Sequence, residues 1–162
     1  MDRTIRTEPL TAETFAPFGD VIEPRGTSHP INAGMVDRFT DLARLDFADG
    51  GRPGISLGLG RPYRLPHRLD LVERHPLGSQ AWMPLGPDPF LVVVAPDEGG
   101  TPGRPRAFLT APGQGVNYLR GTWHGVLTPL DRPQSFLIVD RLGPGYNLEE
   151  YRFPETWTVK AA

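Results

Sequence analysis

The sequence contains no cysteine among its 162 residues. This excludes disulfide bonds, thiolate metal sites and cysteine nucleophiles, and it leaves the redox compartment undetermined. Lysine is almost missing too, because Lys160 is the only one and stands two residues from the end. A Schiff-base mechanism needs a lysine in a desolvated pocket. We therefore expect anionic ligands to be held by arginine or by backbone amides.

Long apolar runs and an excess of one charge are also missing. No run approaches the roughly 20 apolar residues of a membrane-spanning helix, and residues 1–10 are charged rather than arranged as a secretory signal. With 17 basic and 19 acidic residues, the formal charge of −2 provides no basic field for nucleic acid or anionic lipid. We expect a soluble, cytoplasmic protein with no nucleic-acid or membrane partner.

Glycine and proline are abundant, with 19 of each spread along the whole chain. Such residues separate many short elements joined by turns. The length and the hydrophobic fraction of 38% suit one compact domain, over residues 1–162.

Short segments with β-strand character recur between the turns. Apolar residues alternate over 55–59 in the manner of a strand with one buried face. The runs at 90–95 and 136–139 are continuously apolar and rich in β-branched residues, as in buried central strands. Further strands are expected at residues 116–119, 123–127, 151–153 and 157–159, with a tight turn at 120–122 and a polar hairpin loop at 98–106.

Helix signals are sparse. Thr11 to Phe15 predicts a short helix with Thr11 as its N-cap, ended by Pro17 and Gly19. Residues 37–45 are an ambiguous second candidate. Together these patterns predict a mainly-β domain of the sandwich, jelly-roll or barrel type with one or two short helices.

Motifs for phosphate loops, dinucleotide binding and a serine nucleophile elbow are absent from the sequence. Four histidines remain as candidates for chemistry. His29 and His67 each adjoin a proline in loop-like segments, so we interpret both as ordinary surface residues. His75 and His124 instead lie within dense polar clusters on expected strands.

The first polar cluster runs from Glu73 to Gln80. In a strand, Glu73 and His75 face the same side, and a turn at residues 76–79 can return Gln80 to that face. A carboxylate, an imidazole and an amide would then converge. These groups suit Ni²⁺, Mn²⁺, Fe²⁺ or Zn²⁺, or can orient a polar substrate without a metal. The alternative is a surface strand with a polar face.

The second polar cluster runs from Gln114 to Gly125. The second cupin motif reads Gly-x5-Pro-x-Gly-x2-His-x3-Asn, and this chain matches it at Gly113, Gly121 and His124, with Leu119 and Thr128 at the proline and asparagine positions. The first cupin motif, His-x-His-x3–4-Glu, has the spacing of Glu73, His75 and Gln80 in the first cluster. Two partial matches in the right order on a β-rich chain favour a cupin-type double-stranded β-helix.

These two segments resemble the signature segments of the ureidoglycolate lyase (ureidoglycolate hydrolase) family. Supporting similarities lie at residues 9–13, 15–20, 31–38, 139–141 and 147–150. The resemblance implies a cupin fold, commonly in a homodimer, and an enzyme that splits ureidoglycolate into glyoxylate and urea in purine (allantoin) degradation. It implies no organic cofactor, and nickel is associated with some members.

The residues suit that chemistry. Elimination needs a base for the hydroxyl proton and an acid for the departing urea nitrogen. His124 and His75 titrate near the working pH and are candidate acid, base or metal ligand, with Glu73 as the alternative base. A fully equipped cupin carries three histidines and a glutamate where this chain has Glu73, His75, Gln80 and His124. Mechanisms with and without a metal both remain open.

Substrate-binding candidates lie around these residues. Arg120 or Arg38 is expected to clamp the substrate carboxylate. Tyr118, Asn117 and Gln80 can hydrogen-bond the remaining polar groups, although Tyr118 and Asn117 point to opposite faces of one strand, so at most one is expected inside.

Four questions stay open at the level of sequence. Trp82 and Trp123 suit either a dry pocket wall or the core, and Asp140 with Arg141 suits a structural ion pair. The alternative functions are a cupin enzyme for another small hydroxy acid and a non-catalytic small-molecule sensor. Only the family resemblance separates a lyase that releases urea from an amidohydrolase that releases ammonia.

Overall fold

The structure is a computed structural model that describes residues 2–162. It contains one short helix, α1 (Ala12–Phe15), among these residues and is otherwise built from strands. The strands are β1 (Thr4–Pro9), β2 (Gly19–Ile22), β3 (His29–Ile31), β4 (Val36–Arg38), β5 (Arg52–Gly60), β6 (His67–Arg74), β7 (Gln80–Pro84), β8 (Phe90–Ala95), β9 (Asp97–Glu98), β10 (Thr101–Pro102), β11 (Arg106–Leu109), β12 (Gly115–Tyr118), β13 (Trp123–His124), β14 (Thr128–Pro129), β15 (Gln134–Leu142) and β16 (Glu149–Lys160). The predicted mainly-β, cupin-type fold is confirmed.

Six strands close into a ring. Their order is β11-β1-β16-β6-β13-β8, and β8 pairs back to β11 while also carrying β14. Each ring strand contributes at least one side chain to a first core, which includes Ile5, Leu69, Val93, Trp123 and Trp157. Closing the ring removes the free backbone edges that an open sheet would expose.

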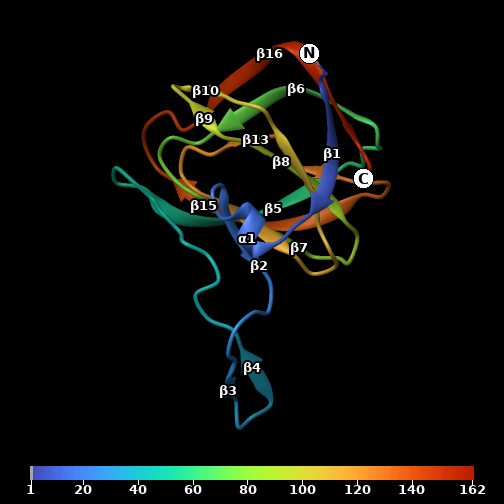
Figure 1. Cartoon of the computed structure of the whole chain (residues 1–162). Coiled ribbons are helices and arrows are strands. Elements are labelled where there is room, and N and C mark those ends of the chain that lie inside the picture. Colours follow the sequence, from blue (N-terminus) through green and yellow to red (C-terminus); the bar gives the residue numbers. More distant parts are fainter. Residues whose placement is uncertain (1) are drawn as a thin grey trace.

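A five-stranded sheet lies against the outside of this ring, in the order β2-β12-β7-β15-β5 (Figure 1). A second core fills the space between them and includes Phe15, Phe108, Val116 and Phe136. Strand β8 serves both cores, because Leu91, Val93 and Ala95 point into the first while Phe90, Val92 and Val94 point into the second. Burial on both faces explains its unbroken apolar sequence.

Strand β5 corrects the sequence interpretation. The strand is present, but its large apolar residues are the exposed ones: Ile55 is 74%, Leu57 66% and Leu59 81% exposed. Its glycines face the interior, where Gly58 lies against the side chains of Trp82 and Ile138. The expected buried face is therefore wrong, because the neighbouring β15 and β7 fill the interior with larger side chains that leave room only for glycine.

The hairpin of β3 and β4 projects away from the rest of the molecule (Figure 1). Every residue from His29 to Arg38 is exposed. The turn between the two strands uses positive φ angles at Asn32, Ala33 and Gly34. We call residues 29–38 the arm. The possible helix at residues 37–45 is absent, because this segment begins inside β4 and continues as irregular chain.

The remaining sequence predictions are confirmed in part. The helix has Thr11 as its N-cap, whose hydroxyl accepts from the Thr14 amide, and 90–95 is β8. Residues 151–153 and 157–159 belong to one strand, β16, interrupted by an irregularity after Arg152. His29 and His67 lie on strands rather than in loops, and His67 is half-buried against Tyr63. No helix within residues 2–162 is long and apolar enough to cross a bilayer.

Candidate active site

Glu73, His75 and His124 form one compact cluster. Glu73 near the end of β6 lies directly across from His124 on β13, and His75 follows β6 immediately. One side-chain ligand atom from each of the three lies within 4.8 Å of the others. The neighbours Val72 and Trp123 point into the ring. Because side chains alternate along a strand, Glu73 and His124 point the other way, toward the five-stranded sheet.

Main-chain carbonyl groups orient both imidazoles. Nδ1 of His75 lies 2.8 Å from the carbonyl oxygen of Asn147, and Nδ1 of His124 lies 3.0 Å from that of Gly125. A carbonyl oxygen can only accept, so each Nδ1 carries the proton. Each Nε2 then holds a lone pair, and both Nε2 atoms are buried with no hydrogen-bond partner. Two such atoms beside a carboxyl group are suited to a substrate or a cation.

Aromatic and apolar side chains enclose the cluster. The ring of Tyr118 stacks on that of His124, with centroids 4.1 Å apart and planes 3° from parallel. Trp82, Leu127 and these two rings line a small cavity beside Glu73, with about 10 Å³ open to the centre of a water molecule. This is room for about one water, so a larger ligand has to displace part of the wall.

Burial controls the protonation of these groups. It raises the pKa of the Glu73 carboxyl above its ordinary value, an effect that His75 opposes and Glu150 reinforces. Burial and the neighbouring His75 lower the pKa of His124 to about 3. Burial, with the nearby charge of Glu73, also raises the pKa of the Tyr118 hydroxyl. At neutral pH the neutral forms of His124 and Tyr118 dominate, and the proton affinity of Glu73 is increased.

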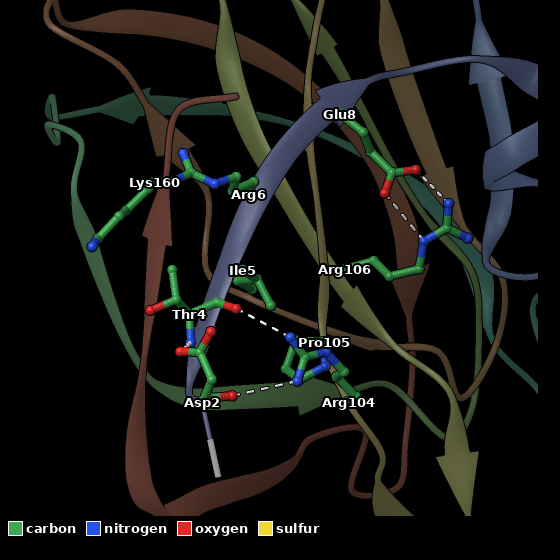
Figure 2. A pocket seen from close by; sticks show the side chains of 9 residues that line it. All are labelled: Asp2, Thr4, Ile5, Arg6, Glu8, Arg104, Pro105, Arg106 and Lys160. Carbon is green, nitrogen blue, oxygen red and sulfur yellow. Dashed lines mark hydrogen bonds and ion pairs between the residues drawn. The ribbon is translucent and has the colours of Figure 1, made fainter.

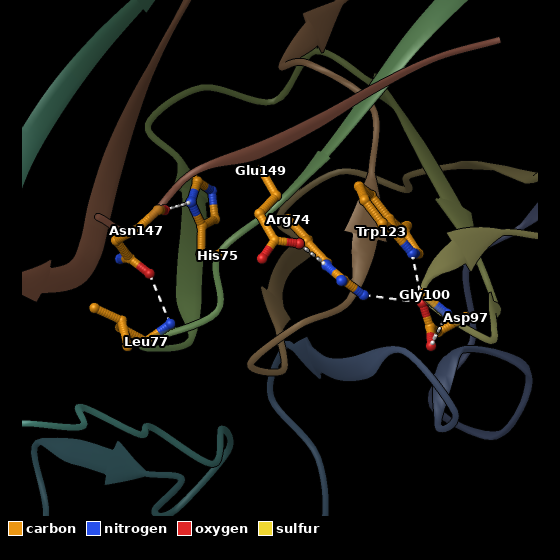
Figure 3. A network of polar contacts seen from close by, with 8 residues as sticks. All are labelled: Arg74, His75, Leu77, Asp97, Gly100, Trp123, Asn147 and Glu149. Carbon is orange, nitrogen blue, oxygen red and sulfur yellow. Dashed lines mark hydrogen bonds and ion pairs between the residues drawn. The ribbon is translucent and has the colours of Figure 1, made fainter. Parts of the chain in front are cut away.

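A second polar network lies behind the cluster (Figure 3). Arg74 sits with its guanidinium 4.3 Å from the ring centroid of Trp123 and forms ion pairs with Glu149 and Asp97. The indole Nε1 of Trp123 donates to the same Asp97, at 2.9 Å. Trp123 is therefore a core residue rather than a pocket wall. The network fixes the end of β6 from which Glu73 and His75 project.

The predicted amide and tyrosine residues separate onto two faces. Tyr118 points to the cluster, whereas Asn117 points away and donates to Asp20 and to the carbonyl oxygen of Arg44. The expectation that at most one of these two lies inside is confirmed. Gln80 pairs with Tyr118 across β7 and β12, so both face the same side. Its amide donates to Asp140, and its Oε1 is buried without a partner.

The two predicted arginines, Arg120 and Arg38, lie in different parts of the structure. The turn that holds Arg120 lies next to His75, because the amide of Gly121 donates to the His75 carbonyl oxygen. The Arg120 guanidinium forms a two-pronged ion pair with Asp46. Arg38 lies at the end of β4 on the exposed arm, which projects away from the rest of the molecule (Figure 1). Of the two alternatives for binding the substrate carboxylate, the structure places Arg120 beside His75 and Arg38 on the arm.

Several neighbours of the cluster escaped the sequence interpretation. Asn147 holds His75, and Arg74 anchors the end of β6. Arg141 forms no ion pair with Asp140 and instead donates to the carbonyl oxygens of Ala48, Asp49 and Pro144. The contact of Asn147 with His75 and those of Arg141 with Ala48 and Asp49 link segments far apart in the sequence, so no local pattern signals them.

A wider groove of about 560 Å³ lies elsewhere, along β1 and β11 (Figure 2). Charged side chains line it, but Arg106 is paired with Glu8, and Arg104 donates to the carbonyl oxygens of Asp2 and Thr4. The groove contains no histidine. It therefore lacks the combination of a carboxyl group and an imidazole that lines the smaller cavity at Glu73.

The cluster also fits a divalent cation. Its donors are one carboxylate and two imidazole nitrogens, a borderline set that suits first-row transition metals. The Nδ1 hydrogen bonds of both histidines leave their Nε2 atoms free to coordinate, as is usual for metal-binding histidines.

The chain is similar to known proteins over nearly its whole length. The family model for ureidoglycolate lyase matches residues 2–160. A ureidoglycolate lyase of Chelativorans sp. is 60% identical over 159 residues, which cover 97% of this chain and 96% of that protein. A ureidoglycolate lyase of Rhodobacter capsulatus is 62% identical over 148 residues, or 91% and 92% of the two chains. The chain therefore belongs to the ureidoglycolate lyase family.

Proposed function

We propose that this protein cleaves ureidoglycolate into glyoxylate and urea. The observation that carries the proposal is that the Glu73 carboxyl group, His75 and His124 lie together, and that the Nε2 atoms of both histidines are buried without a partner. This arrangement lies in a chain about 60% identical to proteins named ureidoglycolate lyase. The cluster offers a base for the hydroxyl proton, hydrogen-bond acceptors for the substrate and a buried site, which suit such an elimination.

The reaction moves one proton and consumes no water. A base takes the hydroxyl proton, the carbon–nitrogen bond breaks, and its electron pair leaves on the urea nitrogen, which then takes up a proton. Glu73 suits both transfers, because its raised pKa makes its carboxylate a stronger base than an exposed one. The same carboxyl group can return the proton to the leaving nitrogen.

The two histidines act as hydrogen-bond acceptors in this proposal. With its pKa lowered to about 3, His124 is a poor proton carrier at neutral pH, but its Nε2 lone pair can accept a hydrogen bond from the substrate. His75 presents its Nε2 in the same way. Both would hold the hydroxyl or urea N–H groups in line with Glu73, and positioning of this kind contributes strongly to catalysis.

Arg120 is the proposed anchor for the substrate carboxylate. It lies on the turn whose backbone is bonded to His75, and a guanidinium can bind two carboxylates at once. Its existing pair with Asp46 holds the side chain in place. Gln80 and Tyr118 line the same face and are proposed to contact the remaining polar groups of the substrate.

Glu73, His75 and His124 are the residues that we propose would hold a divalent cation, with Gln80 as a further candidate donor through its unpartnered Oε1. Such a cation, nickel among the candidates, supplies Lewis-acid polarisation of a bound oxygen. No organic cofactor is proposed.

We further propose that the protein is a homodimer joined through the outer face of the five-stranded sheet. Ile55, Leu57 and Leu59 form an exposed apolar row on β5, which we call the β5 face, and Leu137 and Val139 lie beside them on β15. None of these residues is charged, so the same face of a second copy complements it. Within residues 2–162, β5 pairs with β15 alone and leaves one backbone edge free.

A product assay tests the proposed activity. The purified protein is incubated with ureidoglycolate, with and without chelator, and glyoxylate, urea and ammonia are measured separately. Equal amounts of glyoxylate and urea, formed faster than in buffer, are expected, and loss of rate with chelator would support a bound cation. Ammonia in place of urea would indicate an amidohydrolase. No acceleration would overturn the activity in favour of another substrate or a binding role. The cytoplasmic location stays a prediction.

A further inference from the structure

The loop between β15 and β16 supplies the group that fixes His75. The carbonyl oxygen of Asn147 accepts from His75 Nδ1, at 2.8 Å, and this bond leaves a lone pair on the buried, unpartnered Nε2 of a residue in the Glu73–His75–His124 cluster. If that carbonyl group rotated or moved away, the His75 ring would no longer be held in its Nδ1-protonated tautomer. The position of the Asn147 backbone is therefore a condition for the site.

The side chain of Asn147 ties the same loop to the chain just beyond His75. Its Oδ1 accepts from the backbone amide of Leu77, at 2.8 Å. One residue thus bonds on both sides of Pro76, through its carbonyl to His75 and through its side chain to Leu77 (Figure 3). Two bonds from one residue fix its distance and its rotation relative to the imidazole.

Other anchors of the loop lie further away. Arg141 holds the carbonyl oxygen of Pro144, and Glu149 pairs with Arg74 after the loop ends. Between these points lie Gly145, with a φ of 93°, and Tyr146, which is 78% exposed. The Leu77 bond is therefore the side-chain contact nearest to the carbonyl group that orients His75.

We infer that Asn147 is a positioning residue for His75: its side-chain clamp on Leu77 sets the carbonyl group that selects the Nδ1-protonated tautomer. The inference rests on the proposed function of the Glu73–His75–His124 cluster for its effect on turnover, but the tautomer itself is independent of any substrate. Asn147 acts through His75 and is not assigned any contact with substrate.

Three variants separate positioning from general stability. Asn147→Ala removes the acceptor for the Leu77 amide, Asn147→Asp keeps it, and Tyr146→Ala alters the exposed neighbour as a matched control. We expect kcat for ureidoglycolate to fall about 10-fold in Asn147→Ala with KM changed less than about 2-fold, as for other residues that orient a functional histidine. Asn147→Asp should restore most of kcat, and Tyr146→Ala should leave it unchanged.

A spectroscopic readout tests the inference without any turnover. Nitrogen-15 NMR of the histidine rings distinguishes Nδ1–H from Nε2–H, and the His75 signals are assigned with a His75→Gln variant. Wild type and Asn147→Asp should show the Nδ1–H form, and Asn147→Ala a mixture of both. Should the alanine variant not fold, Asn147→Ser, too short to reach Leu77, replaces it.

The two measurements, of the His75 tautomer and of kcat, distinguish a failure of the inference from a failure of the proposed function. An unchanged Nδ1–H signal in folded Asn147→Ala would overturn the positioning role, whatever the enzyme's substrate. A changed tautomer with no activity on ureidoglycolate in wild type would support the positioning role and count against the proposed function alone. A changed tautomer with unchanged kcat would overturn the link between His75 orientation and turnover.

Discussion

At the scale of a single residue, the burial of Glu73 favours the proposed chemistry but lowers the stability of the fold. Its carboxyl group is half-buried beside two imidazoles, and burial raises its pKa. A raised pKa makes the carboxylate a better base, but holding the charged form in the fold at neutral pH costs free energy. Functional sites commonly give up stability in this way.

Glu73→Gln should therefore raise stability while removing the proposed base. The pKa of Glu73 in the folded protein lies above the ordinary 4.5. Protonated Glu73 therefore makes its full contribution to stability below pH 4.5, and this contribution is lost as the pH rises through the folded-state pKa. At pH 7–8 the neutral amide should therefore raise the midpoint of thermal unfolding above that of wild type.

Thermal unfolding at a series of pH values, with chelator present, checks this expectation. The difference between the variant and wild type should vanish near pH 4, where Glu73 is protonated in both states. A variant that is less stable than wild type at pH 8 would show that the carboxylate is held by attractive contacts rather than strained by burial.

The sequence predicted part of this site well, for a local reason. The two-residue spacing of Glu73 and His75 on a strand requires a shared face, and the spacing around His124 matched a known motif. The position of Arg38 could not be predicted in this way. Arg38 lies on the arm, and no local sequence pattern predicts the direction in which the arm projects. The contact of Asn147 with His75 spans 72 positions and is equally invisible to local spacing.

At the scale of elements, β8 is the strand on which both cores depend. Its alternate residues enter the first and second cores in turn. β5 shows the opposite case, an alternating strand whose apolar row faces outward. The continuous apolar run predicted β8 and the alternation predicted β5, but alternation could not tell which face of β5 is covered, since that depends on what packs against it.

Valine-to-alanine substitutions on either face of β8 should lower the free energy of unfolding by equal amounts. Val93→Ala removes two methyl groups from the first core and Val92→Ala removes two from the second, and each should lower the free energy of unfolding by about 2 kcal/mol. Urea unfolding measures both, with exposed Leu85→Ala as the control that should change little. A near-zero effect for either valine would contradict burial on both faces.

At the scale of the whole molecule, two apolar surfaces remain uncovered. One is the β5 face, and the other is the arm, whose Met35 and Val36 are exposed and which contacts chiefly itself (Figure 1). An isolated two-stranded hairpin is marginally stable in water, so the arm also suits a place against another molecule. A second copy of the chain, as proposed above for the β5 face, would cover such a surface.

Leu57→Asp should convert the proposed dimer into a monomer. A carboxylate at the centre of the β5 face would be buried without a partner in the dimer, and such burial is strongly unfavourable. Light scattering should give twice the chain mass for wild type and for the control Tyr146→Asp, but a single chain mass for Leu57→Asp. A monomeric wild type at micromolar concentration would refute this interface.

The central claim is that the buried cluster performs the cleavage, and the turnover of His124→Ala tests it most directly. His124 provides one unpartnered Nε2, stacks on Tyr118 and lies across from Glu73. Glyoxylate and urea formation by the folded variant should fall at least about 100-fold, while His29→Ala on the exposed arm should match wild type. Wild-type rates in folded His124→Ala would contradict the account.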